Sequence, residues 1–454
     1  MGQMAVPADA LYGAQTARAV ENFPISGWTL PREFLAALAA IKQAAAEVNK
    51  QEGRLDPRLA DAIIAAANEA VEGRLDAHFP LDVFQTGSAT STNMNANEVI
   101  ANRAVQLLGG QLGDKTVHPN DHVNMGQSSN DVIPTAMHIA AAATIRDSLI
   151  PALDGLQESL AAKAQQFDDV VKIGRTHLMD AVPVRLGQEF AGYAAQVDAA
   201  IDVLRDVVTR LGQVALGGTA VGTGLNAPAG FAAAVCSRLA GRLELPIRPA
   251  ANYFAAMGAK DTVVLASGAL KMTALAMGKI ASDIRLLGSG PRCGLGELVL
   301  PSTQPGSSIM PGKVNPVICE SVIQVSCQVI GCDAAVTAGA MGGVGSILEL
   351  NMAMPMIASN LLTAIRLLAS AARVFRDKCV AGLSADAQRC EQLVEQSLAM
   401  VTVLAPRIGY DAAAELAKEA HKTGKTIRQL CLERKVLGAA ELEKLLHARS
   451  QTGG

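Results

Sequence analysis

Residues 306–316, with the sequence GSSIMPGKVNP, place two hydroxyls, one cation and one amide between glycines and prolines. Gly306 and Gly312 allow backbone conformations that other residues avoid, and the prolines stiffen the segment. This composition predicts a mobile lid loop rather than a helix or a strand. The side chains of Lys313 and Asn315 would then point at a carboxylate or a phosphate.

A nucleotide-binding P-loop is the first alternative for this segment. A P-loop has four residues between its first glycine and the Gly-Lys pair, and Ser or Thr follows the lysine. Here five residues intervene and Val314 follows the lysine, so we reject the P-loop. A second alternative, a surface loop whose polar residues are incidental, stays open from this segment alone.

Three further segments gather polar side chains. Residues 86–95 (TGSATSTNMN) and 127–131 (QSSND) lead into helical stretches, where hydroxyls and amides cap helices and exposed N–H groups attract anions. Capping alone explains one or two of these residues but not all of them. Residues 118–124 (HPNDHVN) suggest a metal site, but their crowding into one turn with a proline is unlike a helical metal site. We therefore expect no metal.

His177 follows Gly-Arg-Thr in a polar interruption between helical stretches, and we expect it at a corner between two helices. Isolated histidines are more often structural than catalytic, and both roles stay open at this point. The glycine run at 217–226 lacks the G-x-G-x-x-G pattern of a dinucleotide loop, so it predicts a tight connection between helices. His138 is expected to be a hydrogen-bonded histidine on a helix face.

The composition excludes several classes of function. The formal net charge of −3 at pH 7 argues against a nucleic-acid partner and against polybasic attachment to a membrane. No run of eighteen uncharged apolar residues occurs, and residues 1–7 do not resemble a signal peptide. The eight cysteines form no C-x-x-C pair, which favours buried free thiols over disulfides or zinc. We expect a soluble, cytoplasmic protein.

Hydrophobic residues make up 50% of the chain and aromatic residues 3%, which favours close-packed helices of small and aliphatic side chains. Apolar residues at steps of three and four run through 149–160 and 186–211, as seams between long helices. Residues 262–287 and 317–330 are apolar on nearly every side, so these helices must be covered on every side. They predict the centre of a bundle that is shared between subunits.

The sequence predicts three domains. Residues 1–130 form a mostly helical N-terminal domain, residues 131–380 a central domain of long helices with the lid loop, and residues 381–454 a smaller, more charged helical domain. A helix of thirty residues is about 45 Å long. Polar segments at opposite ends of such helices cannot easily meet within one chain.

The 306–316 segment is the signature loop of the class II fumarase and aspartase superfamily, which this sequence closely resembles. Residues 6–13 (VPADALYG), the GRTH at 174–177 and the glycine run match the same family, and the resemblance runs from about residue 6 to the end. Relatives usually carry more residues before the first motif, so a trimmed start is expected. The resemblance implies an all-α, three-domain fold whose long central helical bundle forms the core of a homotetramer. It also implies active sites drawn from three subunits, with no cofactor.

The resemblance assigns roles to individual residues. Ser307 corresponds to the catalytic base, and His177, coupled to Glu320, to the acid that handles water. The positions that correspond to substrate-binding residues are Ser88, Thr90, Ser128, Ser129, Asn130, Thr176, Ser308, Lys313 and Asn315. A secondary anion site corresponds to His118, Asn120 and Asp121. Ala89 stands where relatives usually carry glycine, which leaves the backbone of that turn open.

The reaction implied is a reversible anti elimination from a four-carbon dicarboxylate, with water or ammonia as the leaving group. His177 before leucine, Ser129, and residues 134–138 (PTAMH) and 294–298 (GLGEL) are fumarase-like, whereas residues 90–92 (TST) are aspartase-like. We favour the hydration of fumarate to L-malate. Aspartate ammonia-lyase is the alternative, and another succinyl-type leaving group is the third. A catalytically silent relative would have lost His177 or the signature loop, and both are present.

Overall fold

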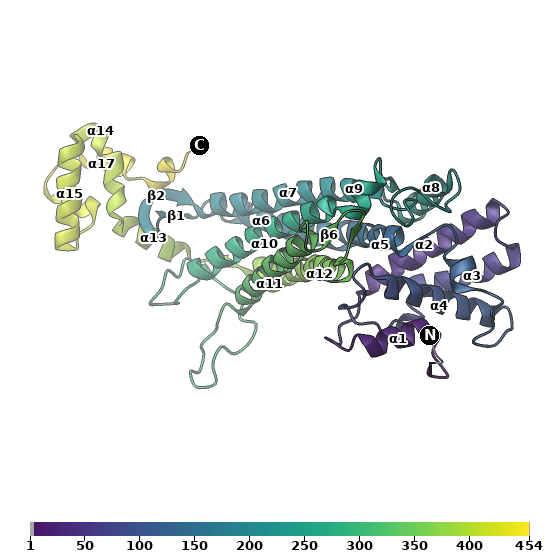
Figure 1. Ribbon diagram of the computed structural model, residues 1–454. Helices are drawn as coiled ribbons and strands as arrows, with labels where there is room; N and C mark the ends of the chain where they lie inside the picture. The colour runs from purple at the N-terminus through teal and green to yellow at the C-terminus, as the bar shows by residue number, and fades with distance from the viewer. Residues whose placement is uncertain (1–3, 454) are drawn as a thin grey trace. The chain divides into compact units, whose positions relative to one another are not determined.

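The computed structural model describes residues 4–453, and helices dominate that part of the chain (Figure 1). The strands in it are short and form two-stranded sheets. The prediction of an all-α fold is therefore confirmed. By the contacts between residues, the chain divides into two compact units, and each is described by itself.

The first unit comprises the residues up to Pro151, Ala200–Ala274 and Val325–Ala369. Its helices α2, α3 and α4 lie side by side (Figure 1). The elements that lie wholly within it are α1 (Ala14–Asn22), α2 (Arg32–Gln51), α3 (Pro57–Val71), η1 (Asp76–His78), α4 (Thr90–Leu107), the π-helical turn η2 (Pro119–Val123), α5 (Ser129–Thr144), η3 (Ile145–Leu149), β3 (Gln213–Val214), α8 (Phe231–Leu243), β4 (Arg248–Pro249), α9 (Tyr253–Gly258), β6 (Ser346–Ile347) and β7 (Leu350–Asn351).

The second unit comprises Ala152–Ala199, Leu275–Gln324 and the chain from Ser370 onward. The elements that lie wholly within it are β1 (Val171–Thr176), β2 (Met179–Arg185), β5 (Leu298–Val299), η4 (Val380–Gly382), β8 (Ser384–Ala385), α13 (Ala387–Gln396), η5 (Leu398–Val403), α14 (Ala405–Ile408), α15 (Tyr410–Thr423), α16 (Ile427–Glu433), α17 (Ala439–Leu445) and η6 (Ala448–Gln451). The helices with residues in both units are α6 (Ile150–Gln166), α7 (Leu186–Leu211), α10 (Asp261–Leu287), α11 (Val317–Ala340) and α12 (Met354–Lys378). The predicted domain boundaries at residues 130 and 380 stay a prediction.

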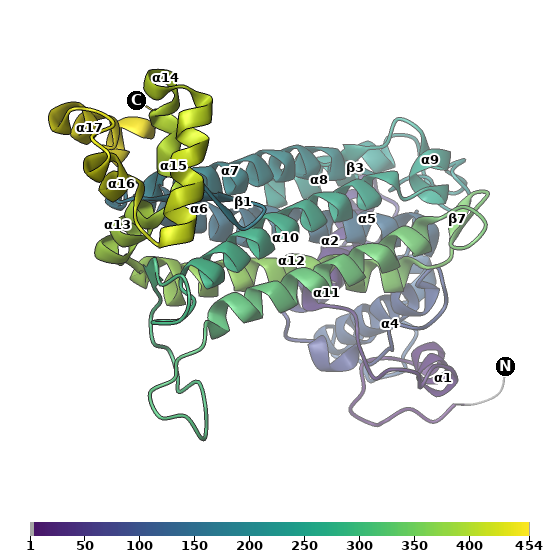
Figure 2. The same cartoon turned by 90° about the vertical axis from the view of Figure 1, so that its left-hand side faces the viewer.

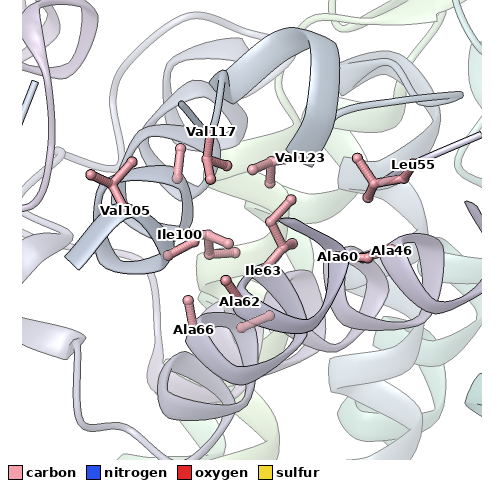
Figure 3. Packing of buried hydrophobic residues seen from close by; sticks show 13 residues of the cluster. Ala46, Leu55, Ala60, Ala62, Ile63, Ala66, Ile100, Val105, Val117 and Val123 are labelled. Atoms are coloured by element: carbon pink, nitrogen blue, oxygen red, sulfur yellow. The ribbon is translucent and has the colours of Figure 1, made fainter. Parts of the chain in front are cut away.

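A cluster of apolar side chains fixes α2, α3 and α4 against one another (Figure 3). Helix α3 begins where the carboxylate of Asp56 caps its first turn and Pro57 follows. Ile63 of α3, Ile100 of α4 and Val123 of η2 are almost completely buried in this cluster. The cluster therefore fixes η2 against α3 and the second half of α4, and with it the polar segments that flank η2.

The predicted apolar seams are confirmed on α6 and α7. Leu153, Leu156 and Leu160 of α6 are fully buried, as are Leu186 and Phe190 of α7. Spacings of three and four residues put such side chains on one side of a helix, where they pack against neighbouring helices. The periodicity of the sequence thus identified the buried side of both helices.

Residues 171–185 form a β-hairpin, so the prediction of a corner between helices at His177 is wrong. Strand β1 pairs with β2 in antiparallel fashion, with Thr176 opposite Met179, and His177 and Leu178 form the turn between them. The φ angles of the two turn residues are 56° and 61°. Positive φ at both positions is what a two-residue type I′ turn requires. Val171 and Ile173 lie in β1 and Val182 and Val184 in β2, and such β-branched residues favour strands over helices.

Three long helices are only partly covered within the single chain. Helices α10 and α11 and the stretch Met354–Gly382 are long and apolar enough to cross a membrane, by length and composition alone. The most apolar part of α10 is 50% buried and that of α11 is 33% buried. Leu275 and Leu286 of α10 and Ile330 of α11 are among the exposed apolar side chains. The all-round apolar helices that the sequence predicted are thus present, and the chain by itself leaves part of their surface uncovered.

The cysteines are free thiols, as the sequence predicted. Cys293 and Cys327 are exposed and the other six are buried. The Sγ atoms of Cys319 and Cys379 are 3.8 Å apart, a distance of contact between thiols and not of a covalent bond. Cys319 is fully buried, in agreement with a packing role.

Candidate functional site

Three hydroxyl side chains, those of Ser88, Thr90 and Ser129, meet in the first unit, and we call them the hydroxyl cluster. The Oγ of Ser88 and the Oγ1 of Thr90 are hydrogen-bonded at 2.8 Å, and Thr90 Oγ1 is hydrogen-bonded to the Oγ of Ser129 at 2.9 Å. Ser88 is buried and the other two are half-buried. The expectation that separate polar segments cannot easily meet within one chain is therefore wrong for this pair, because α4 has only 18 residues and η2 returns the chain to its start.

The backbone before α4 has two special positions. A Cβ atom at Gly87 would lie 2.1 Å from the carbonyl oxygen of Met352, so no larger residue fits there. Ala89 has a left-handed backbone, with φ of 53° and ψ of 30°. Glycine adopts this conformation freely, whereas a residue with a Cβ does so at a cost. The alanine therefore keeps a backbone shape that suits the glycine usual in the family.

The start of α5 is fixed by a buried carboxylate that the sequence analysis did not single out. Ser128 caps α5 through the N–H of Asn130 at 3.3 Å, and Asp131 accepts the N–H of Ser128 at 2.9 Å. Asp131 is fully buried and also accepts the N–H groups of Gly217 and Thr219, each at 3.0 Å. Burial raises the pKa of the Asp131 carboxyl, although these N–H groups oppose the rise. The spacing Ser-x-x-Asp of a capping box was the signal available in the sequence.

The glycine run closes over the start of α5. It connects β3 to α8 without a regular element of its own, as predicted. The amide Nδ2 of Asn130 donates a hydrogen bond to the carbonyl oxygen of Ala220 at 2.8 Å. Asn130 is therefore held by the same segment that binds Asp131.

The predicted secondary anion site lies on η2. The Nδ1 of His118 is 3.1 Å from the backbone N and 3.1 Å from the Oδ2 of Asp121. Asn120 and Asp121 are exposed. Within residues 4–453, no hydrogen bond joins these three side chains to the hydroxyl cluster, so this turn is a separate polar surface.

Buried charges hold the hairpin that carries His177. The Nζ of Lys172 lies 2.9 Å from Glu189 Oε1 and 3.5 Å from Glu297 Oε2, and Arg175 donates to Glu297 Oε2 at 2.9 Å. Lys172 and Glu297 are 1% and 0% exposed. Burial raises the pKa of Glu189, while Lys172 opposes the rise. Strand β1 is thus anchored, and His177 lies exposed at its tip.

The signature loop is irregular, as predicted, and precedes α11. It belongs to the long connection between α10 and α11. This connection extends away from the end of α10 and the start of α11 (Figure 2). The N–H of Gly306 donates to the carbonyl oxygen of Lys313 at 2.7 Å. The Nδ2 of Asn315 donates to the carbonyl oxygen of Gly306 at 2.8 Å. Asn315 thus closes the base of the loop and leaves the tip free.

Ser307 lies inside this closed loop. Its Oγ accepts hydrogen bonds from the N–H of Ile309 at 3.2 Å and from the N–H of Met310 at 3.1 Å. Two N–H donors directed at one hydroxyl oxygen stabilise negative charge on that oxygen. The hydroxyl is half-buried, so it can be reached from outside the loop.

The remaining predicted residues are not brought together in the single chain. Thr176, Ser308 and Lys313 are exposed, and Glu320 is half-buried in the first turn of α11. In the described part of the chain, no hydrogen bond or ion pair links Glu320 to His177. The predicted coupling of these two side chains stays a prediction.

Comparison with known proteins decides the family. The sequence pattern of the lyase family matches residues 2–331, and that of the fumarase C C-terminus matches residues 400–452. Fumarate hydratase class II 2 of Bradyrhizobium diazoefficiens is 53% identical over 453 residues, which cover 99% of this chain and 95% of that protein. The chain belongs to the lyase family, among the class II fumarate hydratases.

Other members of the family agree with this assignment. The mitochondrial fumarate hydratase of Danio rerio is 52% identical over 455 residues, which cover 100% of this chain and 89% of that protein. The crystal structure of the class II fumarase of Schistosoma mansoni has a TM-score of 0.94 at 42% identity and covers 98% of this chain and 96% of that one. A fumarate lyase:delta crystallin of Brucella melitensis, bound to cobalt, has a TM-score of 0.95 at 44% identity, over 99% and 97% of the two chains.

These matches confirm the resemblance to class II fumarases and the class of enzyme, a lyase. They do not assign roles to individual residues, so the roles of the site residues stay predictions. Within residues 4–453, no three His, Cys, Asp or Glu side chains are grouped as metal ligands.

Proposed function

We propose that this chain is a fumarate hydratase that adds water reversibly to fumarate to form L-malate. The observation that carries this proposal is 52% and 53% identity, over the full chain, to fumarate hydratases of a fish and a bacterium. Aspartate ammonia-lyase, which the sequence left open, is not favoured because these relatives are hydratases. The substrate is accordingly a small dicarboxylate.

The hydroxyl cluster supports binding of one substrate carboxylate. Ser88, Thr90 and Ser129 are hydrogen-bonded to one another at the N-terminal ends of α4 and α5. Helix N-termini carry partial positive charge and unpaired N–H groups, both of which attract a carboxylate. Ala89 has no side chain that could cap α4, and of the first N–H groups of α4 the side chain of Gln85 accepts that of Thr92, at 3.1 Å. Ser128 and Asn130 flank the same place.

Ser307 is the proposed base. A serine hydroxyl is a poor base unless its alkoxide is stabilised. The N–H groups of Ile309 and Met310 already point at its Oγ, and the ammonium of Lys313 lies in the same loop. Closing of the loop over the substrate would exclude water and strengthen these interactions.

The chemistry follows from these roles. In the dehydration direction, Ser307 removes a proton from the carbon next to a carboxylate, and the electron pair moves into that carboxylate as an aci-carboxylate. Lys313, Asn315 and Thr176 are the proposed donors to it, and one such donor is commonly worth about 3–4 kcal/mol. The C–O bond then breaks, and His177, assisted by Glu320, protonates the departing hydroxide to give water. No electrons are gained or lost overall, so the mechanism proposed uses no cofactor.

Assembly of the complete site is proposed to need a homotetramer in which three subunits contribute to each site. The absence of a bond between His177 and Glu320 in residues 4–453 of one chain is consistent with such sharing. The uncovered apolar surfaces of α10 and α11 supply a contact area between subunits. A second copy, rather than a lipid bilayer, is the proposed cover, and we propose a soluble cytoplasmic protein. His118, Asn120 and Asp121 are proposed as a secondary site for a dicarboxylate, outside the catalytic one.

The test follows fumarate by its ultraviolet absorbance, in buffer and with high ammonium, and identifies the products. We expect malate in plain buffer. Ser307→Ala should lower kcat by roughly 10²- to 10⁴-fold, the usual contribution of a positioned base. Ser302→Ala, at an exposed serine of the same connection, is the matched control and should retain activity. Consumption only with ammonium, giving aspartate, would overturn the hydratase, and an active Ser307→Ala would overturn the base.

A further inference from the structure

Lys42 is a buried cation that the proposed mechanism does not use. It lies on α2 with 0% of its surface exposed. Its Nζ donates to the Oδ1 of Asn93 at 2.7 Å and to the Oδ1 of Asn124 at 2.8 Å. Both acceptors are neutral amides. Burial of an ammonium without a counter-ion is costly, so its retention calls for a physical reason.

The two amides, of Asn93 and Asn124, belong to the segments that carry the proposed carboxylate site. Asn93 lies in the first turn of α4, three residues after Thr90. The Nδ2 of Asn124 donates to the carbonyl oxygen of Gln127 at 3.1 Å, just before the Ser128 cap of α5. Lys42 therefore holds the two segments whose hydroxyls, on Thr90 and Ser129, lie 2.9 Å apart. Two amides thus connect it to the place where a substrate carboxylate is proposed to bind.

The charged groups around Lys42 do not neutralise it. Asp131 on α5 acts on it electrostatically, but this carboxylate is engaged by three backbone N–H groups and forms no ion pair with Lys42 in the described chain. The buried carboxylate of Glu98 on α4 accepts the backbone N–H groups of Gly13, Gln15 and Thr16. Several other charges on α2 and on the helices packed against it form ion pairs with one another. These pairs are Lys50 with Asp61 of α3, Arg103 of α4 with Glu69 of α3, and Arg238 and Arg242 of α8 with Glu47 of α2.

We propose that Lys42 is the buried countercharge for the substrate carboxylate, and that it positions the hydroxyl cluster through Asn93 and Asn124. The inference rests on the proposed binding of a carboxylate at Thr90 and Ser129. The bound carboxylate supplies the negative charge that the buried ammonium lacks. Substrate binding and protonation of Lys42 are then linked, so each favours the other.

The titration of Lys42 makes this linkage measurable. Burial lowers its pKa to about 7, and Asp131 opposes the fall. The free protein thus loses the charge on Lys42 as the pH rises through about 7. Binding of a dicarboxylate above that pH must take up a proton, and its affinity falls as the pH rises.

The experiment measures the inhibition constant of succinate, an unreactive dicarboxylate, from about pH 6 to about pH 9, on either side of that pKa. Lys42→Met keeps an unbranched stem of similar volume and removes the charge. Its inhibition constant should be about tenfold higher than that of the wild-type protein at pH 6, by loss of one buried charge near the ligand. In Lys42→Met, the inhibition constant should lose the part of its pH dependence that is centred near pH 7. A purely structural role for Lys42 would leave the shape of the pH profile unchanged.

Lys260→Met is the matched control. Lys260 is 2% exposed, and burial lowers its pKa to about 7 as well. Its Nζ donates to the carbonyl oxygens of Met257 and Ala259, at 2.8 and 2.7 Å, and not to the amides behind the hydroxyl cluster. This variant loses a lysine of the same burial and pKa, yet its inhibition constant and pH profile should match those of the wild type.

Asn93→Asp covers the case in which Lys42→Met does not fold. It places a carboxylate against Lys42 within nearly the same volume, so the charge is neutralised and succinate binding should weaken. A folded Lys42→Met or Asn93→Asp protein with the wild-type inhibition constant and pH profile overturns the proposal. Ser129→Ala separates this failure from that of the carboxylate site: unchanged binding in Ser129→Ala would refute the site itself.

Discussion

The hydroxyls of Ser88, Thr90 and Ser129 depend on a strained residue between them. Ala89 adopts the left-handed conformation directly before α4, with φ of 53°. Its side chain is fully buried, so a larger group has no free space around it. Non-glycine residues in this conformation tend to occur at functional sites, where the surrounding structure holds them. The backbone at Ala89 therefore sets the direction in which the Thr90 hydroxyl points.

A substitution series at Ala89 tests this account. Ala89→Val should lower the free energy of unfolding by about 2–4 kcal/mol, because a β-branched residue is disfavoured at positive φ and overpacks a buried site. Ala89→Gly should stay within about 1 kcal/mol of the wild type, because the relief of strain and the loss of a buried methyl group oppose each other. Chemical denaturation of each variant measures both values. A fully stable Ala89→Val protein would show that the turn is not left-handed.

At the residue level, the signature loop and the hydroxyl segments could be predicted because short motifs place polar atoms at fixed spacing. Lys42 could not, since a single lysine in an alanine-rich helix gives no motif. Its position four residues after Leu38 and three before Ala45 puts it on the apolar side of α2, and this was the available signal. Helical periodicity marks a buried position, but it does not say which amides will satisfy the charge there.

The β1–β2 hairpin shows a limit at the level of elements. Short hairpins are predicted from Asn-Gly or Asp-Gly turns, and here the turn residues are His177 and Leu178. Both have positive φ without being glycine. The charges of Lys172, Arg175 and Glu297 anchor the strand that leads to them, but Glu297 is more than one hundred residues away along the chain. The local sequence therefore lacked the turn signal of a hairpin and offered only its β-branched residues, whereas the long helices were predicted from their own periodicity.

Helix α5 is tied to the end of α7 by His138, which makes its stability depend on pH. The Nδ1 of His138 lies 2.9 Å from the carbonyl oxygen of Gln213 and 3.2 Å from that of Leu211. Both partners are acceptors, so Nδ1 carries the proton and donates the hydrogen bond. The prediction of a hydrogen-bonded histidine on a helix face is confirmed. Burial, with a further effect from Lys260, lowers the pKa of His138 from 6.5 to about 4.

The sign of the effect follows from these two pKa values. Between pH 6.5 and about 4, the unfolded chain binds a proton that the folded chain does not, so the stability present above pH 6.5 is lost as the pH falls. The loss should reach about 2 kcal/mol at pH 5. Thermal unfolding should show that His138→Asn loses less stability than the wild type between pH 7 and pH 5. The matched control is His421→Asn, at an exposed histidine of α15, which should follow the wild type. Equal acid sensitivity of the wild type and His138→Asn would contradict this account.

The whole molecule leaves apolar surface that its own fold does not cover. Helices α10 and α11 and the stretch that contains α12 are apolar enough to cross a membrane, yet the most apolar parts of α10 and α11 are only 50% and 33% buried. Periodicity could predict that these helices need cover on every side. The expected cover is another subunit, and that expectation came from the composition of the whole chain, because the periodicity alone does not distinguish a subunit from lipid.

Light scattering and one pair of variants test the assembly. We expect a mass of about four times the 47.0 kDa of the chain, in the absence of detergent.

Leu275→Lys places a charge on the uncovered side of α10, where the leucine is 55% exposed in the single chain. Burial of that charge between subunits is costly, so the tetramer should dissociate and fumarate hydration should be lost, with helical circular dichroism retained. Leu432→Lys, at a leucine 50% exposed on α16, should keep both mass and activity. Activity in a monomeric Leu275→Lys protein would show that one chain carries a complete site, and sharing between subunits would be excluded.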